Sequence, residues 1–329
     1  MKEKFLGLLR GVTGRDALTD IGTRLQERLE KVYIETKVAS ALARAGVTAG
    51  LRKVDPRKPQ TWEFSGFSQH GEDGILAYLR GMIPNPNRFF FEIGSAGGIE
   101  NCTMWFAVAH GYGGIMVEGD PQLTAMCKRA LGVRGIYNVH AVNRFVNREN
   151  IEGLVKMSPH RDPDIFVIDI DSTDYYIMSR ALELGMKPKI VTVEYNSVFG
   201  PEKALTVTYK DTFSRDEEHP SRLYYGASVM AWRNLLGRHG YRFVTVDSSG
   251  VNAFFVDSNI FSEEFVSSLE GVDFVDNMDD LNGATEARAG ADGVEYLPRR
   301  DWRAQFPLIE GMEFVNCADA KGAPPGKGA

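Results

Sequence analysis

The sequence predicts an α/β fold, in which a mostly parallel seven-stranded sheet ends in an antiparallel hairpin and helices precede the sheet. From residue 89 onward, short apolar runs alternate with stretches of helical periodicity, which is typical of consecutive βαβ units. The last two runs, 241–246 and 251–256, are joined by four residues, and so short a link permits only antiparallel pairing. Residues 1–60 show helical periodicity alone.

Composition excludes several classes of protein. With 43% hydrophobic and 25% charged residues over 329 positions, the chain is typical of globular proteins. A net charge of −6 offers no basic stripe for nucleic acid. The three cysteines lie far apart without a C-x-x-C pair, which predicts neither a zinc site nor a disulfide framework. No apolar run approaches the ~20 residues of a membrane span, and the apolar start is too short for a secretory signal, so we expect a cytoplasmic protein.

A helical apolar stripe runs through the N-terminal segment, at Leu18, Ile21, Leu25, Leu29 and Val32. Such a stripe must be buried, either on the protein's own main domain or on a partner subunit. The residues leave both options open, and the second predicts a homo-oligomer formed through the N-terminal helices.

Prolines divide the chain into parts. Two of them stand in the polar stretch 55–59, which predicts a linker there. We therefore expect an N-terminal helical accessory or oligomerisation segment over 1–60, and a main domain over 61–316. The last residues, 317–329, are rich in glycine, proline, lysine and alanine and predict a disordered tail.

The main domain is organised around residues 89–98, which read FFFEIGSAGG. The apolar run predicts a strand that is buried on both faces of the sheet, and the glycines predict a tight turn close to a ligand. Apolar residues at helical spacing follow over 99–109. Strand, turn and helix form a first βα unit whose ligand would lie at the N-terminus of the helix.

The charges around this turn indicate which ligand it binds. The turn reads G-x-x-G-G, whereas the dinucleotide fingerprint is G-x-G-x-x-G. Glu92 ends the strand and Glu100 opens the helix, where a pyrophosphate would need positive or neutral surroundings. Carboxylates suit a ligand that carries an ammonium and a sulfonium, as S-adenosylmethionine does. The alternatives are an NAD-dependent oxidoreductase, a non-catalytic scaffold that keeps this fold, or a Glu92 that is merely a strand-end acid.

Two further stretches point to the same ligand. Glu118 ends the second strand, 24 residues after Gly94, at the separation where an acid meets ribose hydroxyls. Ser68 can cap a helix whose first turn holds Glu72 and Asp73. The polar residues there exceed what a cap needs, so we assign Gln69 and Glu72 to the ligand cleft.

Four oxygen donors follow two neighbouring strands, 164–171 and 190–196. They are Asp169 and Asp171 on the first strand, and Glu194 and Asn196 on the second. Residues two apart on a strand share a side, so the four should converge at the carboxyl edge of the sheet. Hard oxygen ligands without clustered cysteine or histidine predict Mg²⁺, which would hold the acceptor hydroxyls. Alternatively, Asp169 binds the cofactor while Glu194 and Asn196 hold the substrate by plain hydrogen bonds.

The candidate catalytic residues are Asp171, Asp174 and His219. Asp174 lies one helical turn past Asp171, on the same face. His219 lies in a polar loop, 209–219, that could close over the site, and its pKa suits proton removal near neutrality. The alternative for His219 is an exposed histidine without a role.

Several of these residues stand in motifs that occur in a familiar order. The series resembles FkbM-type S-adenosylmethionine-dependent methyltransferases over residues 64–258, in the segments 68–73, 91–94, 101–103, 117–121, 168–175, 193–196 and 252–256. The resemblance implies a Rossmann-like class I methyltransferase fold and O-methylation of a sugar, glycan or other hydroxyl-bearing metabolite. It also implies that Glu92, Gly94 and Ser95 contact the methionine part of the cofactor, that Glu118 contacts its ribose, and that Asp169 and Asp171 face the reaction centre. Asn101 stands in the same motifs, and we assign it to the cofactor site.

Overall fold

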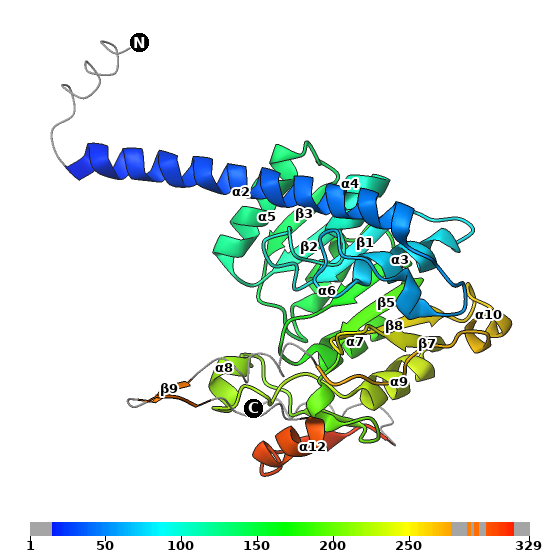
Figure 1. Cartoon of the computed structure of the whole chain (residues 1–329). Coiled ribbons are helices and arrows are strands. Elements are labelled where there is room, and N and C mark those ends of the chain that lie inside the picture. The colour runs from blue at the N-terminus through cyan, green and yellow to red at the C-terminus, as the bar shows by residue number, and fades with distance from the viewer. Residues whose placement is uncertain (1–14, 278–287, 291–292, 296–300, 319–329) are drawn as a thin grey trace.

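A seven-stranded sheet forms the centre of the protein in the computed structural model, which describes residues 15–277, 288–290, 293–295 and 301–318 (Figure 1). Its strands lie in the order β3-β2-β1-β4-β5-β8-β7. Their bounds are β1 (Phe89–Ile93), β2 (Gly113–Glu118), β3 (Val139–Asn143), β4 (Ile165–Ile168), β5 (Ile190–Glu194), β7 (Tyr241–Val246) and β8 (Asn252–Asp257). Only β8 is antiparallel to its neighbours. This order is that of the Rossmann-like class I methyltransferase fold, so the predicted fold and its closing hairpin are confirmed.

Helices cover both faces of the sheet, and the apolar residues of β1 show why. Phe90 faces one side, where the core includes residues of α3 (Glu72–Gly81), α4 (Met104–His110) and α5 (Pro121–Val133). Phe89 and Phe91 face the other side, with α6 (Ile151–Met157), α7 (Asp174–Glu183) and α9 (Val229–Arg238). A strand covered on both faces needs a continuous apolar run, which is what the sequence has at this point.

The N-terminal segment forms one long helix, α2 (Arg15–Leu51), which lies along α5 and extends beyond the body (Figure 1). Ile34, Val38 and Ala41 are buried against the main domain. The predicted stripe is not buried there, since Ile21 and Leu25 are 50% and 57% exposed. Residues 1–14 and the side chain of Leu18 lie outside the described part. Within the described residues, none of the helices has the length and apolar character needed to cross a membrane.

A second, smaller core closes the carboxyl side of the fold. β6 (Leu205–Val207) pairs antiparallel with β11 (Phe314–Asn316), far away in the sequence. The backbone N–H of Cys317 donates to Ala204 O at 2.7 Å, and Cys317 is buried, so the predicted tail does not begin at residue 317. Residues 319–329 lie outside the described part. The remaining elements are η1 (Pro59–Trp62), η2 (Ser197–Phe199), α8 (Arg215–Glu218), α10 (Glu263–Ser267), β9 (Arg288–Gly290), β10 (Gly293–Glu295), α12 (Trp302–Gln305) and η3 (Phe306–Leu308).

Two predicted boundaries were wrong. α4 begins at Met104 rather than Ile99, because residues 99–103 form a loop. The N-cap of α3 is Gly71 in a left-handed conformation, not Ser68. The Ser68 hydroxyl still accepts a hydrogen bond in this region, from the backbone N–H of Asp73 at 3.0 Å.

Candidate ligand-binding site

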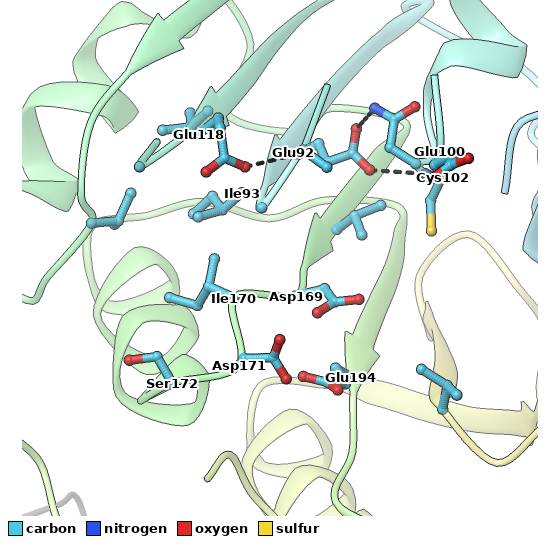
Figure 2. A pocket seen from close by; sticks show the side chains of 18 of the residues that line it. Glu92, Ile93, Glu100, Cys102, Glu118, Asp169, Ile170, Asp171, Ser172 and Glu194 are labelled. Carbon is cyan, nitrogen blue, oxygen red and sulfur yellow. Dashed lines mark hydrogen bonds between the residues drawn. The ribbon is translucent and has the colours of Figure 1, made fainter. Parts of the chain in front are cut away.

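A cavity of about 580 Å³ opens at the carboxyl ends of β1, β2, β4 and β5 (Figure 2). This is the edge at which open α/β sheets bind ligands. Most residues predicted to bind the cofactor line it, namely Gln69, Glu72, Glu92, Gly94, Asn101, Glu118 and Asp169. Ser95 is buried in the turn beside them, and its hydroxyl has no hydrogen-bond partner among the described residues.

Glu92 ends β1 and holds the loop that leads into α4. One carboxylate oxygen accepts from Asn101 Nδ2 at 2.6 Å and from the Thr103 hydroxyl at 2.5 Å. The other accepts the backbone N–H of Cys102 at 3.0 Å (Figure 2). Burial raises the pKa of Glu92 to about 7 in spite of these donors. Glu92 therefore orders the wall of the cavity as well as lining it.

The glycines of the turn allow close packing of the backbone. A Cβ on Gly94 would lie 1.6 Å from Asp169 O, so the tips of β1 and β4 approach each other only because residue 94 has no side chain. Its φ of +90° adds a second reason for glycine. At Gly98, with φ +70°, a Cβ would meet Cys127 Sγ of α5 at 2.7 Å. This packing against β4 and α5 explains why the spacing differs from the dinucleotide fingerprint.

Glu118 joins the glycine turn to the start of α5. Its Oε2 accepts the backbone N–H of Ala96 at 2.9 Å, and its Oε1 accepts that of Asp120 at 2.8 Å. A carboxylate has about four acceptor positions, so both oxygens can accept further hydrogen bonds from a ligand in the cavity.

Asp169, half-buried just after the end of β4, and Glu194, buried at the end of β5, form a pair of neighbouring carboxyl groups (Figure 2). Ile168 is in register with Val193, which places the next residues of both strands side by side. Burial is the main cause that raises the pKa of each well above its ordinary value. The next cause is repulsion, from Asp171 for the Asp169 carboxyl and from Asp169 for the Glu194 carboxyl. Two carboxyl groups this close do not both ionise easily, so the pair keeps a proton to higher pH than an isolated carboxyl group would.

Asp169 and Asp171 both line the cavity, but they follow the end of β4 and do not share one side of a strand as predicted. β4 ends at Ile168, and Asp171 has a φ of +52°. Its Oδ1 pairs with Arg215 Nη1 at 2.5 Å. Arg215 also stacks on the ring of Tyr225 at 3.9 Å and donates from Nε to Arg222 O at 2.7 Å. The pair thus ties α8 and its loop to the rim of the cavity.

Besides Ser95, three predicted site residues do not line the cavity. Asn196 caps η2, with Oδ1 accepting the N–H of Val198 and Nδ2 donating to the carbonyls of Leu223 and Tyr225. The Asp174 carboxylate accepts the backbone N–H groups of Ile170 and Ser172, and burial raises its pKa to about 6. His219 Nδ1 lies 2.7 Å from the Ser221 hydroxyl. All three have local partners in the turns that surround the site.

The predicted magnesium site does not fit this arrangement. Asp169, Asp171 and Glu194 line the cavity, but Asp171 is paired with Arg215 and Asn196 is turned toward residues 223–225. Over the described ranges, no three histidine, cysteine, aspartate or glutamate side chains gather in a way that could hold a metal ion. This part of the prediction is not supported.

Sequence reasoning missed several residues of the cavity. Phe145 follows β3 in a polar stretch, lines the cavity and is 53% exposed. An isolated aromatic residue in a polar loop after a strand was the available signal. Asn252, at the start of β8, donates from Nδ2 to Glu72 Oε1 at 2.8 Å, while its own Oδ1 is buried without a partner in the described structure. Arg144 and Arg215 also line the cavity, and no sequence pattern marked them.

The lining of the cavity is strongly acidic. Its cationic members are Arg144 and Arg215, whereas its acidic members are Glu72, Glu92, Glu100, Glu118, Asp120, Asp169, Asp171 and Glu194. Such a lining favours a positively charged ligand over a pyrophosphate.

The buried acids of this region predict an unusual dependence of stability on pH. Burial raises the pKa of Glu92 and Asp73 to about 7 and that of Asp247 to about 8. Between about pH 4.5 and pH 8 the folded state then binds more protons than the unfolded state, so the free energy of unfolding falls as pH rises. We expect a lower Tm at pH 8 than at pH 5.5 in thermal unfolding followed by circular dichroism.

Two variants check the origin of this slope. Glu92→Gln does not titrate and should flatten the change in Tm with pH, whatever its own stability. Glu310→Gln, at an exposed position, should show the same change in Tm with pH as the wild type. A Tm that rises from pH 5.5 to pH 8 would contradict the assignment.

Comparisons with known proteins give likenesses in structure only. No protein-family model and no curated protein sequence matches the chain. An O-methyltransferase from Bacillus cereus, solved with SAH, is 14% identical over 67% of this chain and 89% of its own, with a TM-score of 0.38. The O-methyltransferase TomG from Streptomyces achromogenes, solved with SAM, is 18% identical over 65% and 96%, with a TM-score of 0.40. Magnesium protoporphyrin IX methyltransferase from Synechocystis, with bound SAM, is 10% identical over 57% and 78%, with a TM-score of 0.37.

Proposed function

We propose that the protein is an S-adenosylmethionine-dependent O-methyltransferase of the FkbM type, which methylates a hydroxyl of a small molecule or glycan. The observation that carries the proposal is the acidic cavity at the carboxyl edge of a sheet with methyltransferase strand order. A sulfonium and an ammonium complement this charge, and a dinucleotide does not. The motif series of residues 64–258 supports the FkbM type and the hydroxyl acceptor.

The residues of the cavity fit this cofactor. Gly94 and Ala96, on either side of Ser95, line the cavity, and Asn252 Nδ2 holds the lining residue Glu72 by a hydrogen bond. Glu118 would accept hydrogen bonds from the ribose diol, and Glu72 would face the ammonium group. The half-exposed ring of Phe145 offers a surface on which an adenine can stack. When bound, the cofactor supplies an electrophilic methyl group.

The Asp169–Glu194 pair is the best placed base. Asp174 and His219 lie outside the cavity lining, whereas both members of the pair belong to it. An oxygen of the unprotonated carboxylate would accept a hydrogen bond from the acceptor hydroxyl and take up its proton when that hydroxyl is methylated. The raised pKa of the pair strengthens it as a base. Alignment of the acceptor in the cavity provides the rest of the rate enhancement.

Calorimetry tests the cofactor. S-adenosylmethionine is expected to bind, and NAD is not. Glu118→Gln should weaken the binding of S-adenosylmethionine by about tenfold, because the charged carboxylate that accepts hydrogen bonds from the ribose becomes a neutral amide. Glu310→Gln removes the same charge at an exposed site outside the cavity lining and should leave affinity unchanged. NAD binding in place of S-adenosylmethionine would favour the oxidoreductase instead.

A screen of hydroxylated acceptors tests turnover and metal together. Because the oxygen donors do not fit a resident metal, we expect activity to survive dialysis against EDTA within about twofold. Methyl transfer from labelled S-adenosylmethionine would be measured before and after dialysis. Activity that is lost with EDTA and restored by Mg²⁺ would contradict this expectation and support the predicted magnesium site. Cofactor binding without turnover on any acceptor would favour the scaffold.

A further inference from the structure

The long helix α2 has two apolar faces, and only one of them is used within the chain. On the inner face, Ile34, Val38 and Ala41 are buried, and Glu30 forms an ion pair with Arg129 of α5. At 100° per residue, the opposite face carries Ile21, Leu25, Leu29 and Val32, whose side chains are 50–62% exposed.

This outer face continues along the helix as a stripe, which we call the outward stripe. It contains Ile21, Leu25, Leu29, Val32, Thr36, Ala39, Ala43 and Val47, and all of these residues are exposed. Their spacing of three or four residues keeps them on one side of a straight helix, and none of them is charged. The half before Val32 has large side chains, whereas the half after it has mainly small ones.

We propose that the outward stripe binds the same stripe of a second copy of this chain, antiparallel, with the two-fold axis through Val32. In this register Leu25 lies opposite the partner's Ala39 and Ile21 opposite the partner's Ala43. Leu29 lies within one residue of direct opposition to the partner's Thr36. Large side chains thus meet small ones along the whole contact, which lets the two helices approach closely. An interface of this isologous kind makes every contact twice.

The charges beside the stripe fit the same register. Arg28 and Glu35 are seven residues apart, so they lie on the same side of the helix, and both are exposed. An antiparallel pair centred on Val32 brings each Arg28 next to the partner's Glu35, within one residue of direct opposition. The arrangement therefore gives two ion pairs, one at each side of the axis.

A second copy fits better than a membrane surface. The outward stripe is flanked by residues of both signs, such as Arg28 and Glu35, whereas a surface-binding helix has a basic flank and bulky apolar residues throughout. The main domain lies against the inner face of α2 (Figure 1). A partner helix on the outer face therefore does not bring the main domains of the two copies into collision.

Sedimentation equilibrium of the full chain tests the association. A dimer is expected at micromolar concentration. Val32→Glu places two carboxylates at the axis and should give a monomer, whereas Tyr137→Glu, at a site 83% exposed and away from α2, should remain dimeric. Arg28→Glu should raise the dimer Kd at least threefold, and adding Glu35→Arg should reverse that change. A wild-type monomer at about 100 µM would overturn the proposal, with or without binding to anionic vesicles.

Engineered cysteines test the orientation. The native cysteines in the described residues are buried, which keeps the background of cross-linking low. Val32→Cys should form a disulfide-linked dimer on mild oxidation, because the two residues meet at the axis. Ala39→Cys should not, since the two sites are 14 residues apart along the pair, about 21 Å. Cross-linking of both variants would indicate parallel helices and overturn the antiparallel register.

Discussion

Glu194→Gln is expected to lower kcat for methyl transfer by at least about 100-fold, which is the lower part of the range for loss of a general base. Glutamine keeps the size of the side chain and can still hydrogen-bond to Asp169, but the pair can no longer take up the acceptor's proton in the same way. S-adenosylmethionine affinity should change by less than about threefold, because the acceptor, not the cofactor, contacts this oxygen. The measurements are kcat with saturating cofactor and calorimetry of cofactor binding.

The pH profile separates a base from a structural residue. In the wild type, kcat should rise with pH as the pair loses its proton, and the rise should be displaced above the ordinary range of a carboxyl group because burial raises the pKa of both members. That rise should disappear in Glu194→Gln. His219→Gln examines the other candidate base. If His219→Gln abolished activity while Glu194→Gln remained active, the base would be His219, and the assignment of the Asp169–Glu194 pair as the base would be wrong.

Gly94→Ala is expected to destabilise the protein by more than about 4 kcal/mol, enough to prevent folding in many domains. The new Cβ would lie 1.6 Å from Asp169 O, a backbone atom that cannot move without separating β1 from β4. The φ of +90° adds strain. Urea unfolding, or the soluble yield where the variant does not fold, provides the measurement.

Gly185→Ala is the matched control. Gly185 has a φ of +87°, almost that of Gly94, but a Cβ there would have no neighbour within 4 Å. Gly185→Ala should therefore lose only the stability that the positive φ costs a residue with a side chain, about 1–2 kcal/mol. Equal losses in the two variants would mean that backbone conformation, and not the contact between strand tips, accounts for the requirement at residue 94.

The strands of the main sheet and its closing hairpin followed from the sequence because a buried parallel strand leaves a strong local pattern. The run Phe89–Ile93 is buried throughout and apolar at every position except Glu92, and the short link 247–250 allowed only a hairpin. The pairing of β6 with β11 left no such pattern, since three-residue strands more than a hundred positions apart carry no periodicity of their own.

The strand ends are the part of the candidate site for which the sequence carried the most direct signal. Glu92, Glu118, Asp169 and Glu194 stand at or next to the tips of their strands, where the alternation of a strand still fixes direction. Asp171 and Asn196 lie beyond the tips, where turn conformation decides. The positive φ of Asp171 and the capping role of Asn196 depend on tertiary partners that local sequence does not specify. Likewise, the direction of the α2 stripe depends on which face packs against α5, because the helix is apolar on both.

The acidic lining of the cavity stores electrostatic self-repulsion in the ligand-free protein. A cation that enters relieves this repulsion, so by mass action its binding raises the melting temperature, and an anion of equal size does not. Thermal shift measurements can therefore rank candidate acceptors by charge before any assay of turnover exists.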